Sequence, residues 1–232
     1  MKVTQYKALG FSFGTLIDWE RGILDGLRPL LVQAQAQSEN EIGDEQLLDA
    51  YRGLAAELVA TGTCDSPSAF HGQLYQRLAH QLRIVPGWDE SVAFSTASGQ
   101  WPIFEDVPGA LQYLAKFYRL LIVAPPCGMD TEALTRRLPV EFDAIIKPQA
   151  GDWHASLDQA LQRLGLERSE LLPVRSTERD DPWSDRVDFP VCTLRRDHHQ
   201  PWNHSAQALD GKRCEYASLA DLVHAHHKAL HA

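Results

Sequence analysis

Three residues of this chain carry the side chains that covalent catalysis requires. Cys127 has a thiol, His154 an imidazole and Asp180 a carboxylate. In such a set the thiolate attacks the substrate, the imidazole takes up the thiol proton, and the carboxylate orients the imidazole. Because the sequence gives no distances between these residues, the competing interpretation is three unrelated loop residues.

A second group of candidates lies toward the end of the chain. His224, His226 and His227 fall in a predicted helix, and His224 and His227 share a face where they could bind a transition metal. No acidic residue or cysteine stands at a fixed spacing from them, so we expect a solvated helix and no metal site. Arg195 and Arg196 could clamp an anion, but surface ion pairs are their expected role.

Composition argues against several classes of protein. The 232 residues include 22 Lys and Arg against 31 Asp and Glu, which gives a formal net charge of −9. Nucleic-acid binding generally needs a basic surface for the phosphates. No apolar run approaches the ~20 residues of a membrane span, and residues 1–7 do not resemble a signal peptide. We expect a cytoplasmic protein with free thiols that binds neither nucleic acid nor membrane.

Hydrophobic patterns predict an α/β protein with a helical insertion. A buried strand over residues 6–13 is followed by amphipathic helices throughout residues 20–95, one of which begins at Ser66 with a capping hydroxyl. Beyond Trp101, apolar strands without alternation are interleaved with helices, as in a parallel sheet covered on both faces. Residues 195–213 are expected to form a surface loop. The later strands are expected at 120–124, 142–147, 171–176 and 189–194, and the helices at 107–117, 130–138, 155–165 and 218–230.

Short strings spread over nearly the whole chain suggest a relationship. They are GTLIDWE at 14–20, QWP at 100–102, DVPGAL at 106–111, FDAII at 142–146 and YASLADL at 216–222. In their residues and in their order along the chain, these strings resemble the haloacid dehalogenase superfamily, above all its L-2-haloacid dehalogenase-like branch. The resemblance implies a Rossmann-like parallel-sheet core over residues 1–18 and 100–232, with an α-helical cap inserted over residues 19–99.

The resemblance also implies where catalytic residues would stand, and three of four motifs are changed. Family members have a nucleophilic Asp at the position of Phe11, whose side chain has no nucleophilic atom, so the aspartyl-ester route is closed. The motif Ser or Thr corresponds to Ala124, and the motif Lys to His154. Asp180 and Asp181 keep the fourth, acidic motif. Without the first carboxylate we expect no bound metal and no cofactor.

Further residues are expected around a ligand cleft between cap and core. Phe11 should fill the former nucleophile space, and Ser12 should point to the other side of the strand. Asp18 is expected to cap the first cap helix or to contact the substrate region, and Arg21 is placed to meet a carboxylate. Trp153 and Trp183 are expected to line the old pocket. The complete set of cleft candidates is Ser12, Asp18, Arg21, Trp153, Asp181 and Trp183.

Two functions remain open at this point. The first is a non-hydrolytic, haloacid dehalogenase-like protein with a binding or scaffold role in the cap–core cleft, for a small molecule or a protein. The second is an enzyme with a rebuilt site of Cys127, His154 and Asp180 that acts on a small carboxylate. A homodimer is compatible with either function.

Overall fold

The computed structural model divides by its internal contacts into two compact units. It describes residues 3–37, 42–62, 65–125, 127–147, 153–177, 183, 190–196, 207–210 and 213–231. The core unit comprises Met1–Ile17, Ile103–Pro125 and Thr135–Ala232, and the cap unit comprises Asp18–Pro102 and Pro126–Leu134. The chain therefore leaves the core twice, once for the long helical insertion and once, briefly, after its second strand.

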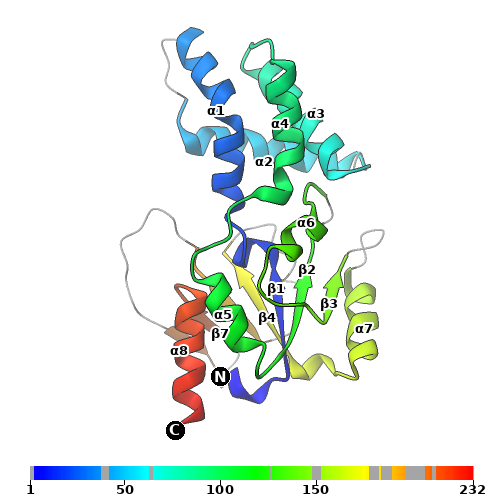
Figure 1. The fold of residues 1–232 in the computed structure, drawn as a ribbon, viewed down its shortest axis with the longest axis vertical. Coiled ribbons are helices and arrows are strands. Elements are labelled where there is room, and N and C mark those ends of the chain that lie inside the picture. The colour runs from blue at the N-terminus through cyan, green and yellow to red at the C-terminus, as the bar shows by residue number, and fades with distance from the viewer. Residues whose placement is uncertain are drawn as a thin grey trace. The chain divides into compact units, whose positions relative to one another are not determined.

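Within the described residues, one seven-stranded sheet forms the middle of the core unit (Figure 1). Its order is β3-β2-β1-β4-β5-β7-β6, and every neighbouring pair is parallel except β6 and β7. The strands are β1 Ala8–Ser12, β2 Arg119–Val123, β3 Ala144–Ile146, β4 Leu171–Ser176, β5 Val191–Leu194, β6 Gln207–Asp210 and β7 Arg213–Tyr216. Strand β1 lies inside the sheet, and all five of its residues are buried. This burial on both faces explains its apolar sequence without alternation.

Helices cover the sheet of the core unit. The helices are α5 Val107–Leu114, α7 Trp153–Leu164 and α8 Leu219–Leu230. Helix α7 packs Leu157 and Leu161 into a cluster with Ala8 of β1 and Leu121 of β2. Helices α5 and α8 contact each other. Because successive side chains of a strand point to opposite faces, Phe11 lies on the face of β1 opposite Ala8.

The cap unit consists mainly of amphipathic helices. They are α1 Trp19–Gln37, α2 Asp44–Ala60, α3 Pro67–Gln81 and α4 Trp88–Thr96, joined by the first turn of α6 Thr131–Arg136. Helix α3 begins as the sequence predicts, because Ser66 Oγ accepts a hydrogen bond from the Ala69 N–H at 3.1 Å. Gly128 has a φ of +80°, and a Cβ there would lie 2.9 Å from Phe70 Cε1. The short second excursion is thus packed closely against a cap helix.

The fold class predicted from the sequence is confirmed, with one correction at the edge of the sheet. Strands β1 to β5 fall within one residue of the expected segments or inside them. The expected loop at 195–213 instead contains β6, and β7 begins at its last residue. β6 is a four-residue edge strand that pairs only with β7, so its pairing depends on tertiary contacts rather than on local pattern. Among the described helices, none is both long and apolar enough to cross a membrane.

Candidate functional site

The residue at the former nucleophile position, Phe11, is completely buried. Its register partners are Ile122 on β2 and Val174 on β4, and both are also fully buried. Phe11 is among the largest fully buried side chains of the described residues. The carboxyl end of β1 thus has an aromatic ring between two aliphatic strands, which is a packing environment rather than a reactive one.

The turn after β1 is closed by its own hydrogen bonds. Phe13–Thr15 forms one turn of 3-10 helix, and the Thr15 hydroxyl donates to the Ser12 carbonyl oxygen at 2.6 Å. The Leu16 and Ile17 N–H groups both donate to the Phe13 carbonyl oxygen at 2.9 Å. Ser12, a cleft candidate, is 1% exposed. Its side chain is therefore closed to a ligand in this structure.

A half-buried arginine, Arg196, connects this turn to the rest of the core unit. Its Nε and Nη2 donate to the Thr15 carbonyl oxygen at 3.0 and 2.6 Å, and its Nη1 donates to both oxygens of Asp106 at 2.9 and 3.0 Å. The guanidinium also lies 4.1 Å from the ring centroid of Phe104. Asp106 Oδ2 in turn accepts the Leu219 N–H at 2.7 Å, at the start of α8.

This arrangement corrects the expectation of surface ion pairs for one arginine of the pair. The Arg196 side chain is only 10% exposed, whereas the Arg195 side chain is 56% exposed and pairs with Glu215. The sequence does not reveal this role of Arg196, because its partners lie 90 and 181 residues away along the chain. Asp106 stands at the start of α5 without capping that helix, and its carboxylate accepts hydrogen bonds from Arg196 and Leu219 instead.

Trp183 belongs to the hydrophobic core instead of lining an open pocket. Its side chain is 1% exposed and joins the cluster formed by Leu157 and Leu161 of α7. A Cβ on Gly10 would lie 2.8 Å from Trp183 Cζ2, so the indole covers the face of β1 opposite Phe11. Trp153, which is half-buried, meets Trp183 edge-to-face at 5.1 Å. The expectation that Trp183 faces a ligand is therefore corrected.

Of the candidate set of Cys127, His154 and Asp180, the first two belong to different units of the chain and are described separately. Cys127 is disulfide-bonded, which corrects its assignment as a nucleophile, whereas Cys192 and Cys214 are buried free thiols, as the sequence predicts. Sequence spacing alone could not reveal this bond, because a disulfide depends on distances in the fold. His154 lies in the first turn of α7, stacked on Trp153 at 4.1 Å. Asp180 and Asp181 lie outside the described residues.

The remaining candidates have structural partners within their own units. Asp18 caps helix α1, as one of the two sequence interpretations expected, because its Oδ1 accepts the Arg21 N–H at 3.1 Å. The Arg21 side chain is exposed and pairs with Asp25 at 3.8 Å. Ala124 is buried after β2, and its N–H donates to the Ile146 carbonyl oxygen at 2.9 Å.

A buried histidine in the cap unit escaped the sequence analysis. His71 is fully buried, with its Nε2 3.4 Å from the Tyr51 hydroxyl and its Nδ1 3.4 Å from the Pro67 carbonyl oxygen. The rings of Phe94 and Trp101 contact it edge-to-face. Desolvation by burial lowers the pKa of His71 to about 4. The imidazole is therefore neutral at pH 7, with Nδ1 as its donor and Nε2 as its acceptor.

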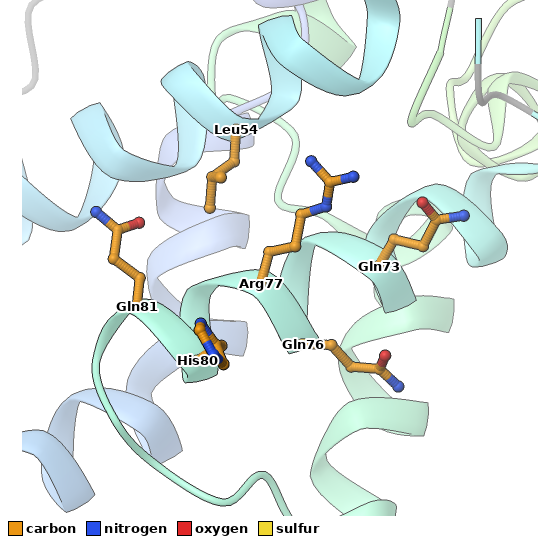
Figure 2. A pocket seen from close by; sticks show the side chains of 6 residues that line it. All are labelled: Leu54, Gln73, Gln76, Arg77, His80 and Gln81. Atoms are coloured by element: carbon orange, nitrogen blue, oxygen red, sulfur yellow. The ribbon is translucent and has the colours of Figure 1, made fainter. Parts of the chain in front are cut away.

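A surface hollow of about 470 Å³ lies on the cap unit and includes none of the residues singled out by sequence (Figure 2). It is bordered by helices α2 and α3, and its side chains are mostly polar. Arg77 at its centre pairs with Glu57 at 3.7 Å. The lining residues are Leu54, Gln73, Gln76, Arg77, His80 and Gln81.

Comparison with known proteins identifies the fold. No family model matches the chain, and no curated protein matches its sequence. An L-2-haloacid dehalogenase of known structure is 15% identical, covers 98% of this chain and 100% of its own, and has a TM-score of 0.67. The enzyme from Xanthobacter autotrophicus with chloropropionic acid covalently bound is 18% identical over 94% of this chain and 97% of its own, with a TM-score of 0.64. The resemblance expected from the sequence is thus confirmed at the level of fold.

Proposed function

We propose that this chain, which has the fold of the L-2-haloacid dehalogenases, does not perform aspartyl-ester hydrolysis and acts instead by binding a small molecule or a protein. The observation that carries the proposal is the completely buried Phe11 at the position of the nucleophile. An aspartyl-ester mechanism needs a carboxylate that can attack the substrate. A phenyl ring offers no such atom.

The surroundings of Phe11 support this proposal. Its register partners, Ile122 and Val174, are hydrocarbon side chains that offer no substitute nucleophile. Ala124 has a methyl group where the resemblance places a hydroxyl. On the opposite face of β1, Trp183 fills the space over Gly10 with an indole. This packing at the end of β1 supports a protein that keeps the fold but does not use the end of β1 for catalysis.

The competing enzyme with a rebuilt cysteine site is not favoured. A thiolate is the reactive form of cysteine, and the Cys127 sulfur is already in a disulfide bond. We therefore keep the binding role as the single proposal.

The test is turnover by the purified full chain on a panel of 2-haloacids and phosphate monoesters. We expect no halide or phosphate release above buffer, for the native chain and for the matched Phe11→Leu variant alike. Release by the native chain that survives repeated purification and disappears in Asp180→Asn would contradict the proposal.

The Phe11→Asp variant asks whether position 11 alone blocks the reaction. Its buried carboxylate should destabilise the core, so folding is checked first by circular dichroism. Halide release by Phe11→Asp but not by the native chain would show that Phe11 closes an otherwise competent site. A folded but inactive Phe11→Asp variant would show that the other motif changes also prevent hydrolysis.

A further inference from the structure

The end of helix α8 holds two exposed histidines one helical turn apart. His227 lies in the last turn, and His231 follows as the residue that ends the helix. Their ring centroids are 4.6 Å apart, with ring planes inclined by 56°. Both side chains are exposed, so both imidazoles are accessible to an ion from solvent. Helical spacing of four residues places them on one face.

The separation of the two rings suits ligation of one metal ion. An imidazole nitrogen binds such an ion at about 2.0–2.1 Å, so two imidazoles on one ion have ring centroids roughly 4.5 Å apart at a right angle and roughly 5.2 Å apart at the tetrahedral angle. The observed 4.6 Å lies in this range without a change of backbone.

The local charge of the helix end also favours a cation. The last turn of a helix carries a partial negative charge from its free carbonyl groups. The His231 N–H donates to the Lys228 carbonyl oxygen at 3.3 Å, which fixes the backbone of this turn. The Lys228 ammonium lies in the same turn and opposes a second cation, so the affinity should be moderate.

The neighbouring histidines do not complete a larger site. His226 points into the core unit, where its Nδ1 lies 3.1 Å from the Tyr113 hydroxyl. Within the described part of the chain, no three His, Cys, Asp or Glu residues are grouped to hold a metal. A bound ion would therefore take two protein nitrogens and complete its coordination with water or a small external ligand.

We propose that His227 and His231 bind a divalent transition-metal ion, with Cu²⁺ bound more tightly than Ni²⁺ or Zn²⁺. Imidazole suits all three ions, and the general order of stability places Cu²⁺ first. The ion bridges the last turn of α8 and so holds that turn in its helical conformation.

The first measurement is Cu²⁺ binding to the full chain, followed by electron paramagnetic resonance and competition with a soluble chelator. We expect the Cu²⁺ signal of the tightest site to show superhyperfine splitting from two nitrogen ligands. Loss of one of the two ligands in His227→Ala or His231→Ala should weaken Cu²⁺ at least as much as the ~10-fold typical of losing a supporting residue. His224→Ala removes another exposed histidine of the same helix and should leave the tightest site unchanged.

Three results would overturn the proposal: an unchanged site in either ligand variant, an equal loss in His224→Ala, or a spectrum with one nitrogen only. Amide exchange gives an independent measurement with Zn²⁺. Exchange in the last turn of α8 should slow in the native chain and not in His231→Ala. Circular dichroism verifies that each variant keeps its helices.

Discussion

The indole of Trp183 determines which residue can stand at position 10. A Cβ added to Gly10 would lie 2.8 Å from Trp183 Cζ2 and 3.3 Å from a methyl group of Leu171, so the alanine side chain has no room unless the core shifts. Overpacking of a filled core typically costs 1–3 kcal/mol. We expect Gly10→Ala to lower the free energy of unfolding by about 1–3 kcal/mol, measured by urea denaturation.

Gly109→Ala provides the matched control for that substitution. Gly109 lies in helix α5 of the same unit, and nothing lies within 4 Å of the Cβ that alanine would add there. Alanine in a helix is favoured over glycine by up to about 1 kcal/mol, so this variant should be neutral or more stable. If both substitutions changed stability equally, the close approach of Trp183 to β1 would not be the cause.

Arg196 acts at the scale of elements, because it links the end of β5, the turn after β1 and, through Asp106, helices α5 and α8. Removing one partner of a buried ion pair leaves the other charge uncompensated, at a typical cost of 3–5 kcal/mol. Since Asp106 is 17% exposed, water recovers part of this loss. We expect Arg196→Met to lower the free energy of unfolding by about 2–4 kcal/mol in urea denaturation.

The adjacent residue offers the comparison for this prediction. Arg195 pairs with Glu215 at the surface, and exposed pairs contribute about 0–1 kcal/mol. Arg195→Met should therefore change stability little, and the change should shrink further in high salt. Equal effects of the two substitutions would refute the role assigned to Arg196.

Local pattern predicted the elements of this fold far better than it predicted side-chain partners. The apolar runs that became β1, β2 and β4 and the Ser66 cap are local signals, since the neighbouring residues determine them. Strand β6 depends on pairing with β7, and the Arg196 network depends on residues far away in the chain. The disulfide of Cys127 and the closure of Trp183 over Gly10 likewise depend on distances that spacing does not encode.

At the scale of the whole molecule, the neutral buried His71 makes stability depend on pH. Its pKa is lowered to about 4 in the fold, whereas an unfolded histidine has a pKa near 6.5. Below pH 6.5 this histidine binds a proton in the unfolded chain but not in the folded chain. The free energy of unfolding therefore falls as the pH decreases from about 6.5 to about 4. The full effect is up to ~3 kcal/mol, because each pKa unit corresponds to 1.36 kcal/mol.

Thermal unfolding between pH 4 and pH 8 tests this prediction. The His71→Gln variant keeps a donor and an acceptor but does not titrate, so its stability should fall less over the same range. A smaller slope should remain, because burial also lowers the pKa of His226. A slope unchanged in His71→Gln would exclude His71 as the titrating group.

The second, short excursion of the chain has a consequence for modularity. The chain passes between the two units after Ile17, Pro102, Pro125 and Leu134. A single excision at Ile17 and Pro102 would remove the four long helices but leave the segment that places Gly128 against Phe70 and Asp130 beside Ser98. The excised helical piece would expose the Phe70 ring, because Gly128 would stay behind with the core unit. The insertion is therefore not a cassette that can be transplanted as one continuous piece, and a chimera would have to exchange two separate segments together.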